Sequence, residues 1–221
     1  MHFPQSDVGP IIANLQSTLA KWRDYNTSPR LAVWDPLRTW FASQGLHIFD
    51  HAPESTVVKP PTNKLRAHDG TYSTHYNPPN IAHEHRRAVH CIARTTDGRD
   101  VLIRVVAKGK EGLQDLDILQ YIATGHRAFL GDNHCLPMLR TLVLEDMTFA
   151  VFPFVDTGFS YPWYHNVDEV FDAVLQVLQG FEFLHRHLIA HRDVGADNIL
   201  INLAEGPLAP LEKWGERPLP V

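Results

Sequence analysis

The 221-residue chain has few cysteines, no excess of positive charge and no long apolar run. Cys91 and Cys135 are its only cysteines and stand in no CxxC or zinc-ligand spacing, so neither a disulfide framework nor a structural zinc site is predicted. A formal net charge of -5 leaves no electrostatic footprint for a nucleic acid. No run of about 18 apolar residues and no signal-peptide pattern are present. We therefore expect an intracellular protein, cytoplasmic or nuclear, with neither a nucleic-acid nor a membrane partner.

The N-terminal part of the chain predicts helices followed by a linker. Apolar residues line one face of a helix over residues 10–22. A second helix should begin with Asp35 as N-cap and Pro36 at the first helical position, and it should end at Gly45. Residues 51–80 are rich in proline, histidine and polar residues without a period, which indicates a loop and a boundary near residue 80.

The rest of the chain alternates between strand and helix patterns. The first element is a hairpin of two strands, over residues 88–93 and 101–106, followed by a helix over residues 113–122 that ends at Gly125. A second hairpin follows, over residues 139–144 and 149–155, and then a long amphipathic helix over residues 166–184. Asp97-Gly98 is the turn signal of the first hairpin. Asn166, with Glu169 three residues later, forms a capping pair at the start of the long helix.

The segment from His191 to Asn198 carries the chemistry that the sequence predicts. Its letters His191, Arg192, Asp193 and Asn198 match the pattern H-R-D-x-x-x-x-N, between the long helix and a short apolar run. In that chemistry the aspartate accepts the proton of the attacking hydroxyl, and the asparagine five positions later gives magnesium a neutral oxygen ligand. The alternative interpretation is a chance match in which Asp193 caps a turn.

On these residues the chain resembles the protein kinase superfamily over about residues 81–202. It looks especially like the kinase-domain proteins that are numerous in mushroom-forming fungi, and the segments Phe181 to His185 and Asn133 to Pro137 carry that narrower resemblance. The resemblance implies a bilobal α+β fold with ATP and Mg as cofactors. It divides the chain into a helical N-terminal extension and linker, a small lobe and the start of a large lobe, at residues 1–80, 81–155 and 156–221.

The resemblance also assigns roles in the small lobe. Arg104 ends a Val-Leu-Ile-Arg run that stands in the place of the third-strand V-A-I-K motif, so it would pair with the phosphates. Asp115 would be its acidic partner, with Asp117 and Glu111 as competitors. A long arginine opposite a short aspartate could restore the pair. The alternatives are an edge-strand surface charge for Arg104 and a solvated helix face for Asp115.

The second hairpin would end in the segment that contacts adenine. Phe152 resembles the gatekeeper, and the Pro153 carbonyl and the Val155 backbone would face the base. Proline fits there because only its carbonyl is needed. A plain strand end is the alternative.

Several kinase features are missing. Gly70 is the only glycine between residues 46 and 97, so a G-x-G-x-x-G phosphate loop has no candidate. Gly195 replaces the lysine common in serine/threonine kinases, and no Asp-Phe-Gly follows Asn198. The chain therefore looks truncated and impaired in turnover. A pseudokinase or fragment that binds a protein partner is one rival. A small-molecule kinase of the aminoglycoside or choline type is another, although Arg192 favours the protein-kinase branch.

The histidine pairs are weaker candidates. His83-Glu84-His85 and His185-x-His187 have spacings that could bind a metal, but in a histidine-rich chain we expect surface or packing roles for them.

Overall fold

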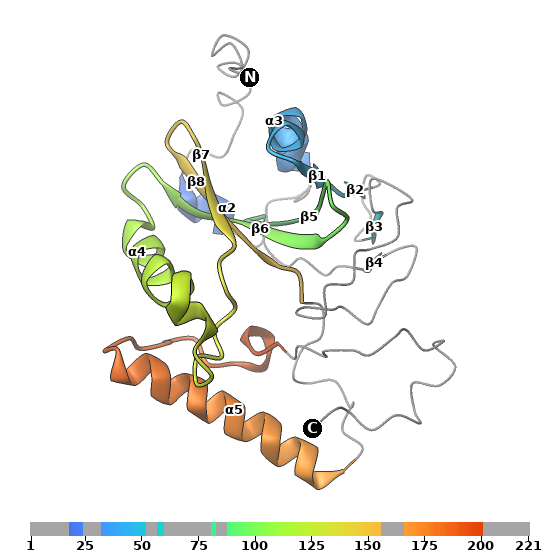
Figure 1. The fold of residues 1–221 in the computed structure, drawn as a ribbon. Helices are drawn as coiled ribbons and strands as arrows, with labels where there is room; N and C mark the ends of the chain where they lie inside the picture. Colours follow the sequence, from blue (N-terminus) through green and yellow to red (C-terminus); the bar gives the residue numbers. More distant parts are fainter. Residues whose placement is uncertain are drawn as a thin grey trace. The chain divides into compact units, whose positions relative to one another are not determined.

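The computed structural model describes residues 18–23, 32–51, 57–59, 81–82, 88–155 and 166–200. It has an α+β fold, as the sequence predicts, with helices and antiparallel strands (Figure 1). The chain divides into two compact units, each described by itself below. Unit 1 comprises residues 1–67, 78–117 and 139–152, and unit 2 comprises residues 68–77, 118–138 and 153–221.

A five-stranded sheet forms the centre of unit 1. Its strands are β1 (Leu46–Ile48), β5 (His90–Thr95), β6 (Asp100–Lys108), β7 (Arg140–Leu144) and β8 (Met147–Pro153), in the order β1-β5-β6-β8-β7. Both predicted hairpins are confirmed as antiparallel pairs, β5 with β6 and β7 with β8. Gly98 has φ +91° in the first turn, a conformation that favours glycine.

Strand β1 is a feature that the sequence did not predict. It follows Gly45 directly and pairs antiparallel with β5, with Leu46 opposite Thr95. Three residues are too few to show an alternating pattern, and the partner strand lies more than forty residues away in the chain. Residues assigned to the N-terminal extension thus supply an edge strand to the sheet that the sequence places in the small lobe.

The predicted linker also contains strands. A second, three-stranded sheet has the order β2-β3-β4, formed by Asp50–His51, Val57–Lys59 and Ile81–Ala82. The expectation of a loop over residues 51–80 is therefore wrong at His51, which ends β2, and at Val57–Lys59. The run is too short, and too closely followed by Pro60 and Pro61, to produce a strand signal of its own.

Three short helices are described in the N-terminal part of the chain. They are α2 (Leu19–Arg23), the 3-10 helix η2 (Ala32–Leu37) and α3 (Arg38–Ser43). Most of the helix predicted over residues 10–22 lies outside the described residues. The prediction that Asp35 is an N-cap is wrong, because Asp35 and Pro36 lie inside η2 and its carboxylate binds Arg38. Gly45, at φ +76°, follows the helix end as predicted.

Aromatic side chains from these helices cover one face of the five-stranded sheet. The Trp34 ring lies 5.4 Å from Trp22, 5.9 Å from Phe41 and 6.0 Å from Phe149, measured between ring centroids. The Trp34 indole N–H donates to the Ala88 carbonyl at 2.8 Å. Val101, Ile103 and Val105 of β6 join this core cluster. Because side chains alternate along a strand, the residues between them face the opposite side of the sheet.

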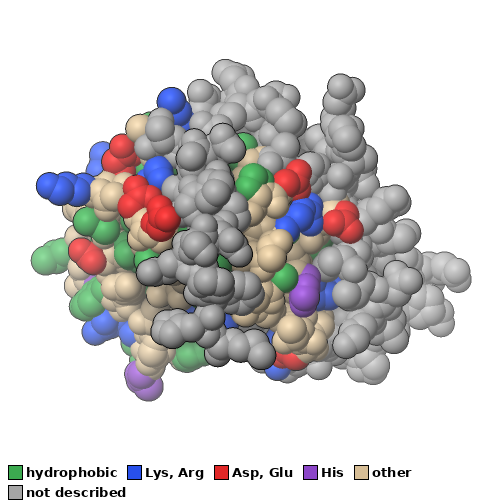
Figure 2. All heavy atoms as spheres, turned by 90° about the horizontal axis from the view of Figure 1, so that it is seen from above, with side chains coloured by type: hydrophobic (Ala, Val, Ile, Leu, Met, Phe, Trp, Pro, Cys, Tyr) green, Lys and Arg blue, Asp and Glu red, His purple; other side chains and the backbone are tan. Residues whose placement is uncertain are grey.

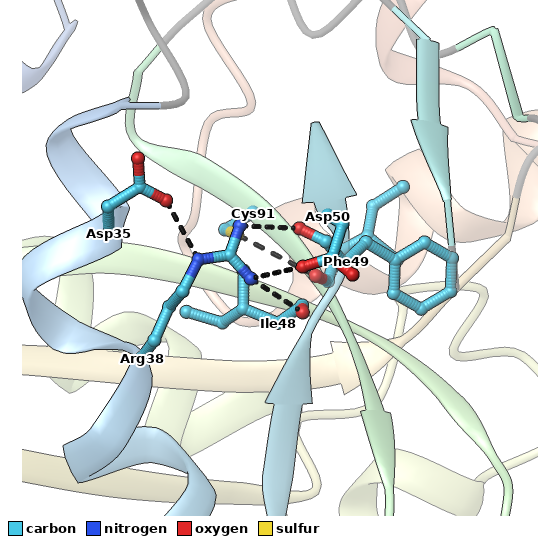
Figure 3. Close-up of polar contacts among 7 residues, drawn as sticks. Asp35, Arg38, Ile48, Phe49, Asp50 and Cys91 are labelled. Carbon is cyan, nitrogen blue, oxygen red and sulfur yellow. Dashed lines mark hydrogen bonds and ion pairs between the residues drawn. The ribbon is translucent and has the colours of Figure 1, made fainter. Parts of the chain in front are cut away.

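Arg38 links α3 to the end of β1 (Figure 3). Its guanidinium donates to the Asp35 and Asp50 carboxylates at 2.8 and 3.1 Å, and to the Ile48 and Phe49 carbonyls at 3.0 and 2.9 Å. The arginine therefore satisfies two backbone carbonyls at the point where β1 ends, which helps to hold this short edge strand in place.

Unit 2 contains the long helix α5 (Val167–Arg186), the 3-10 helices η3 (Gly125–Phe129) and η4 (Ala196–Asn198), and the C-terminal half of α4 (Leu113–Ile122). The predicted capping pair of α5 is confirmed, because the Asn166 side chain accepts from the Glu169 N–H at 2.9 Å.

Much of the apolar surface of α5 is exposed. Phe183 and Leu184 are buried near its C-terminal end, whereas Phe171 is 67% exposed and Leu178 59%. The apolar face is as broad as the sequence indicates, but only its C-terminal part is buried.

On the face shown in Figure 2, the described residues include positively and negatively charged side chains that lie interspersed. This agrees with the absence of a basic excess in the composition. Within the described ranges, no helix combines the length and the apolar character that crossing a membrane requires.

Candidate functional site

The predicted catalytic loop contains a hydrogen bond between its two key residues. The Asn198 side-chain amide donates to the Asp193 backbone carbonyl at 2.9 Å. The Asn198 backbone N–H donates to the Gly195 carbonyl at 3.0 Å, which closes η4. Since only the NH₂ of an amide can donate to a carbonyl, the amide oxygen of Asn198 remains as the atom that could bind a cation.

The end of α5 sets the direction of this loop. Leu188 has φ +59°, and the Ile189 N–H donates to the Leu184 carbonyl at 2.9 Å, an arrangement that terminates the helix. Arg192 also has a positive φ of 65°, which is uncommon for a residue with a Cβ. The His191 ring makes an edge contact with Phe181 of α5, with centroids 5.7 Å apart. The loop is thus tied to the helix at both the backbone and a ring.

The side chains of the loop are accessible. His191, Arg192, Asp193 and Asn198 are all exposed. A carboxylate can accept a proton from an approaching hydroxyl, and an amide oxygen can bind magnesium. The donor set therefore suits a hard cation and a hydroxyl substrate. All four residues lie in one short segment because they are close neighbours in the chain, and Asn198 is the last residue of η4.

Asn133 and its neighbours, which carry part of the family resemblance, have a structural role in unit 2. Asn133 is buried, and its amide donates to the Ile122 and Arg127 carbonyls, each at 2.8 Å. Its oxygen accepts from the Cys135 N–H at 3.0 Å. Burial raises the pKa of the Cys135 thiol to about 11. The three hydrogen bonds of the Asn133 side chain fix the segment that follows η3.

Two side-chain contacts then connect this segment to α5. Asp132 pairs with Arg186, and this hydrogen bond holds the pKa of the Asp132 carboxyl below its ordinary value. His134 bonds to Gln179 at 3.2 Å. The segment therefore holds the C-terminal half of α5, from which the loop emerges.

Arg104 and Phe152 lie on the same face of the sheet in unit 1. Val151 on β8 and Ile103 on β6 point into the aromatic core, so their neighbours Phe152 and Arg104 face the opposite side. Arg104 is half-buried and stands opposite His90 of β5. Phe152 is buried, as are Pro153 and Val155 in unit 2. The predicted contacts of these residues with a nucleotide stay predictions.

Asp115 pairs with a cation that the sequence did not suggest. Its carboxylate binds Arg23 of α2 at 2.9 Å, and both side chains are exposed. Its competitor Glu111 accepts from the Leu19 backbone N–H at 2.8 Å, and Asp117 is exposed on α4. No sequence signal could have identified Arg23, since it is 92 residues from its partner. The pairing of Asp115 with Arg104 stays a prediction.

Metal binding by the histidine pairs finds no support among the described residues. The described residues contain no group of three or more His, Cys, Asp or Glu side chains that could hold a metal ion. Nδ1 of His187 bonds to the Phe183 carbonyl at 2.8 Å and its ring packs on Phe183, which is the packing role expected for it. His83-Glu84-His85 lies outside the described residues.

No family model matches this chain.

Proposed function

We propose that the chain is a protein-kinase-like domain that binds ATP with magnesium, with phosphoryl transfer to a protein hydroxyl as the associated reaction. The observation that carries the proposal is the hydrogen bond from Asn198 to the Asp193 carbonyl. This hydrogen bond closes a loop between the aspartate and the asparagine of the H-R-D-x-x-x-x-N pattern, the two residues on which its chemistry depends. A chance match to the pattern would not require the two residues to be bonded.

The position of Arg104 supports the same proposal. Because β1 belongs to the sheet, β6 is its third strand in chain order, and helix α4 follows it directly. The phosphate-pairing cation of kinases ends a V-A-I-K run on the third strand, and its acidic partner lies on the next helix. Arg104 and Asp115 have those places in the order of elements.

The residues then have the following proposed roles. Asp193 accepts the proton of the attacking hydroxyl and Asn198 holds magnesium through its amide oxygen, which suits the preference of this cation for oxygen ligands. Arg104 pairs with phosphate oxygens through its planar guanidinium. When bound, magnesium neutralises the charge of the nucleotide phosphates.

A second candidate function is nucleotide-dependent or nucleotide-independent binding of a protein partner without turnover. Gly195 places no cation next to the transferring group, and no Asp-Phe-Gly follows Asn198 in the 221 residues. Both departures lower the expected rate of transfer more than they lower nucleotide affinity.

Calorimetric titration of the full chain with ATP, with and without magnesium, tests the proposal. We expect binding that magnesium strengthens and that Asn198→Ala weakens by about ten-fold or more, the magnitude of a contact to a charged group. Gln176→Ala removes an exposed side-chain amide from α5 of the same unit and should change nothing. A folded wild-type chain that binds no ATP would contradict the proposal and favour the partner-binding function.

A further inference from the structure

Helix α5 (Figure 1) carries two separate apolar stripes. The first stripe is covered: Gly180 and Leu184 are buried, and Ala173 and Val177 are half-buried. Spacings of four, three and four residues keep these positions on one side of the helix. A Cβ added to Gly180 would lie 3.3 Å from the Cβ of His134, so the segment after η3 approaches α5 closely on this side.

The second stripe has the same spacing but is exposed. Its members Val167, Phe171, Val174 and Leu178 are 66%, 67%, 39% and 59% exposed, and exposed Val170 and Leu175 widen it on either side. Each residue turns a helix by about 100°, so an offset of six positions from the first stripe places the second about 120° away around the axis. We call these six residues the exposed stripe of α5.

The pattern of the exposed stripe fits another helix. Alternating spacings of four and three residues form the seam of a coiled coil, into which side chains of a facing helix pack. A contiguous apolar patch with a polar border is typical of a protein-protein interaction site, whereas single exposed apolar residues need no explanation. The occupant is therefore expected to be an amphipathic helix.

The charged residues that border the exposed stripe are acidic. Asp168 and Glu182 are exposed, and they lie along one flank because they are fourteen residues, or two heptads, apart. Asp172, one turn after Asp168, is exposed as well. Within the described part of the chain none of these three carboxylates forms an ion pair. Arg186, the only lysine or arginine of α5, pairs with Asp132 instead.

This charge pattern disfavours a second copy of the chain as the occupant. Antiparallel pairing of two α5 helices centred on Leu175 would set Asp168 of one copy against Glu182 of the other, and like charges opposite each other disfavour a partner. Parallel pairing would set the acidic flank against the flank that carries Val170 and Val177. Neither arrangement gives the carboxylates a cation, whereas a basic partner does.

We propose that the exposed stripe of α5 docks an amphipathic helix of a partner protein whose apolar seam is flanked by lysine or arginine. Apolar side chains of the partner pack between Phe171, Val174 and Leu178, and its cations lie beside Asp168 and Glu182. This inference goes beyond the proposed function and does not depend on nucleotide binding.

Three model peptides of roughly 18 residues test the proposal with the full chain, because shorter helices are marginal in water. One has leucine at the seam positions and lysine elsewhere, one has glutamate in place of lysine, and one is a scrambled form of the first. Fluorescence anisotropy of the labelled peptides measures binding. We expect the lysine peptide to bind about ten-fold or more tightly than the other two, with an affinity that falls as salt is added.

Variants of α5 then locate the binding surface. Phe171→Gln with Leu178→Gln should weaken binding of the lysine peptide about ten-fold or more, since both remove apolar area from the interface. Asp168→Asn with Glu182→Gln should weaken it roughly two- to five-fold and reduce its salt dependence. Val143→Gln is the matched control, because Val143 is 63% exposed on β7 of unit 1, and it should change nothing. All these side chains are exposed, so circular dichroism and Tm should match the wild type.

Every other outcome overturns the inference. Equal binding of the lysine and glutamate peptides would show that charge does not select the partner, and equal binding of the scrambled peptide would show that no helical seam is recognised. Binding that Phe171→Gln with Leu178→Gln leaves unchanged would place the site elsewhere. Self-association of the chain that this double variant abolishes would identify a second copy as the occupant. A folded chain that binds none of the peptides also contradicts the inference, and the test of the proposed function with ATP is unaffected.

Discussion

The ion pair between Arg94 and Asp100 gives the sharpest prediction about stability. The two side chains are 5% and 3% exposed and form two hydrogen bonds, of 2.7 and 3.1 Å, across the β5–β6 hairpin. The Arg94 guanidinium also lies over the Phe49 ring, 5.4 Å from its centroid. Asp100→Asn keeps the volume but removes the negative charge that pairs with the buried guanidinium at these two hydrogen bonds. Breaking a buried pair from one side costs about 3–5 kcal/mol.

That cost is a large part of the roughly 5–15 kcal/mol by which domains are stable. At about 2–4 °C per kcal/mol for a chain of this size, the Tm should fall by about 6–20 °C. Urea and thermal unfolding, followed by fluorescence of the buried tryptophans and by circular dichroism, measure the change.

Two further variants test whether the loss comes from burial of an unpaired charge. Arg99→Ala removes the exposed pair with Asp97 and should cost less than about 1 kcal/mol. Replacing both partners, Arg94→Met with Asp100→Leu, should recover most of the loss, because neither charge remains buried. If Asp100→Asn alone costs less than about 1 kcal/mol, the pair does not contribute to the fold as argued.

Three further predictions concern other parts of the chain. Trp34→Ala should destabilise by about 3–5 kcal/mol, since it empties a site that is 1% exposed and leaves the Ala88 carbonyl without its donor; Trp34→Phe should cost clearly less, and equal losses in urea unfolding would contradict the packing argument. Asn166→Ala should remove about 1 kcal/mol by deleting the N-cap of α5, while Asn166→Asp retains it; helicity and unfolding free energy report this. Burial raises the pKa of the Cys91 thiol and raises that of Cys135 to about 11, so both thiols stay protonated at pH 8. In a thiol titration with a disulfide reagent, both should react slowly in the native chain and rapidly in urea. Cys135 should react faster as the pH approaches 11, and rapid native labelling at pH 8 would show that the pKa values are not raised.

The sequence by itself determined the features that depend on neighbours in the chain. Asp97-Gly98 specifies a hairpin turn whatever surrounds it, and Asn166 with Glu169 caps α5 through bonds that span three residues. The loop from His191 to Asn198 belongs to the same class, since its internal hydrogen bond joins residues five apart.

Only the tertiary structure decided the contacts between distant segments. Strand β1 pairs with β5, which lies more than forty residues away in the chain. Asp115 binds Arg23, which is 92 residues away. Asp35 shows the same limit at short range, because Arg38 takes the carboxylate that would have capped a helix. Pairings of this kind depend on which surfaces the core brings together, and the aromatic cluster around Trp34 places α2 and β1 on the sheet. A local sequence pattern cannot predict these tertiary contacts, because the free energy that stabilises them comes from apolar burial shared among many residues rather than from any single residue.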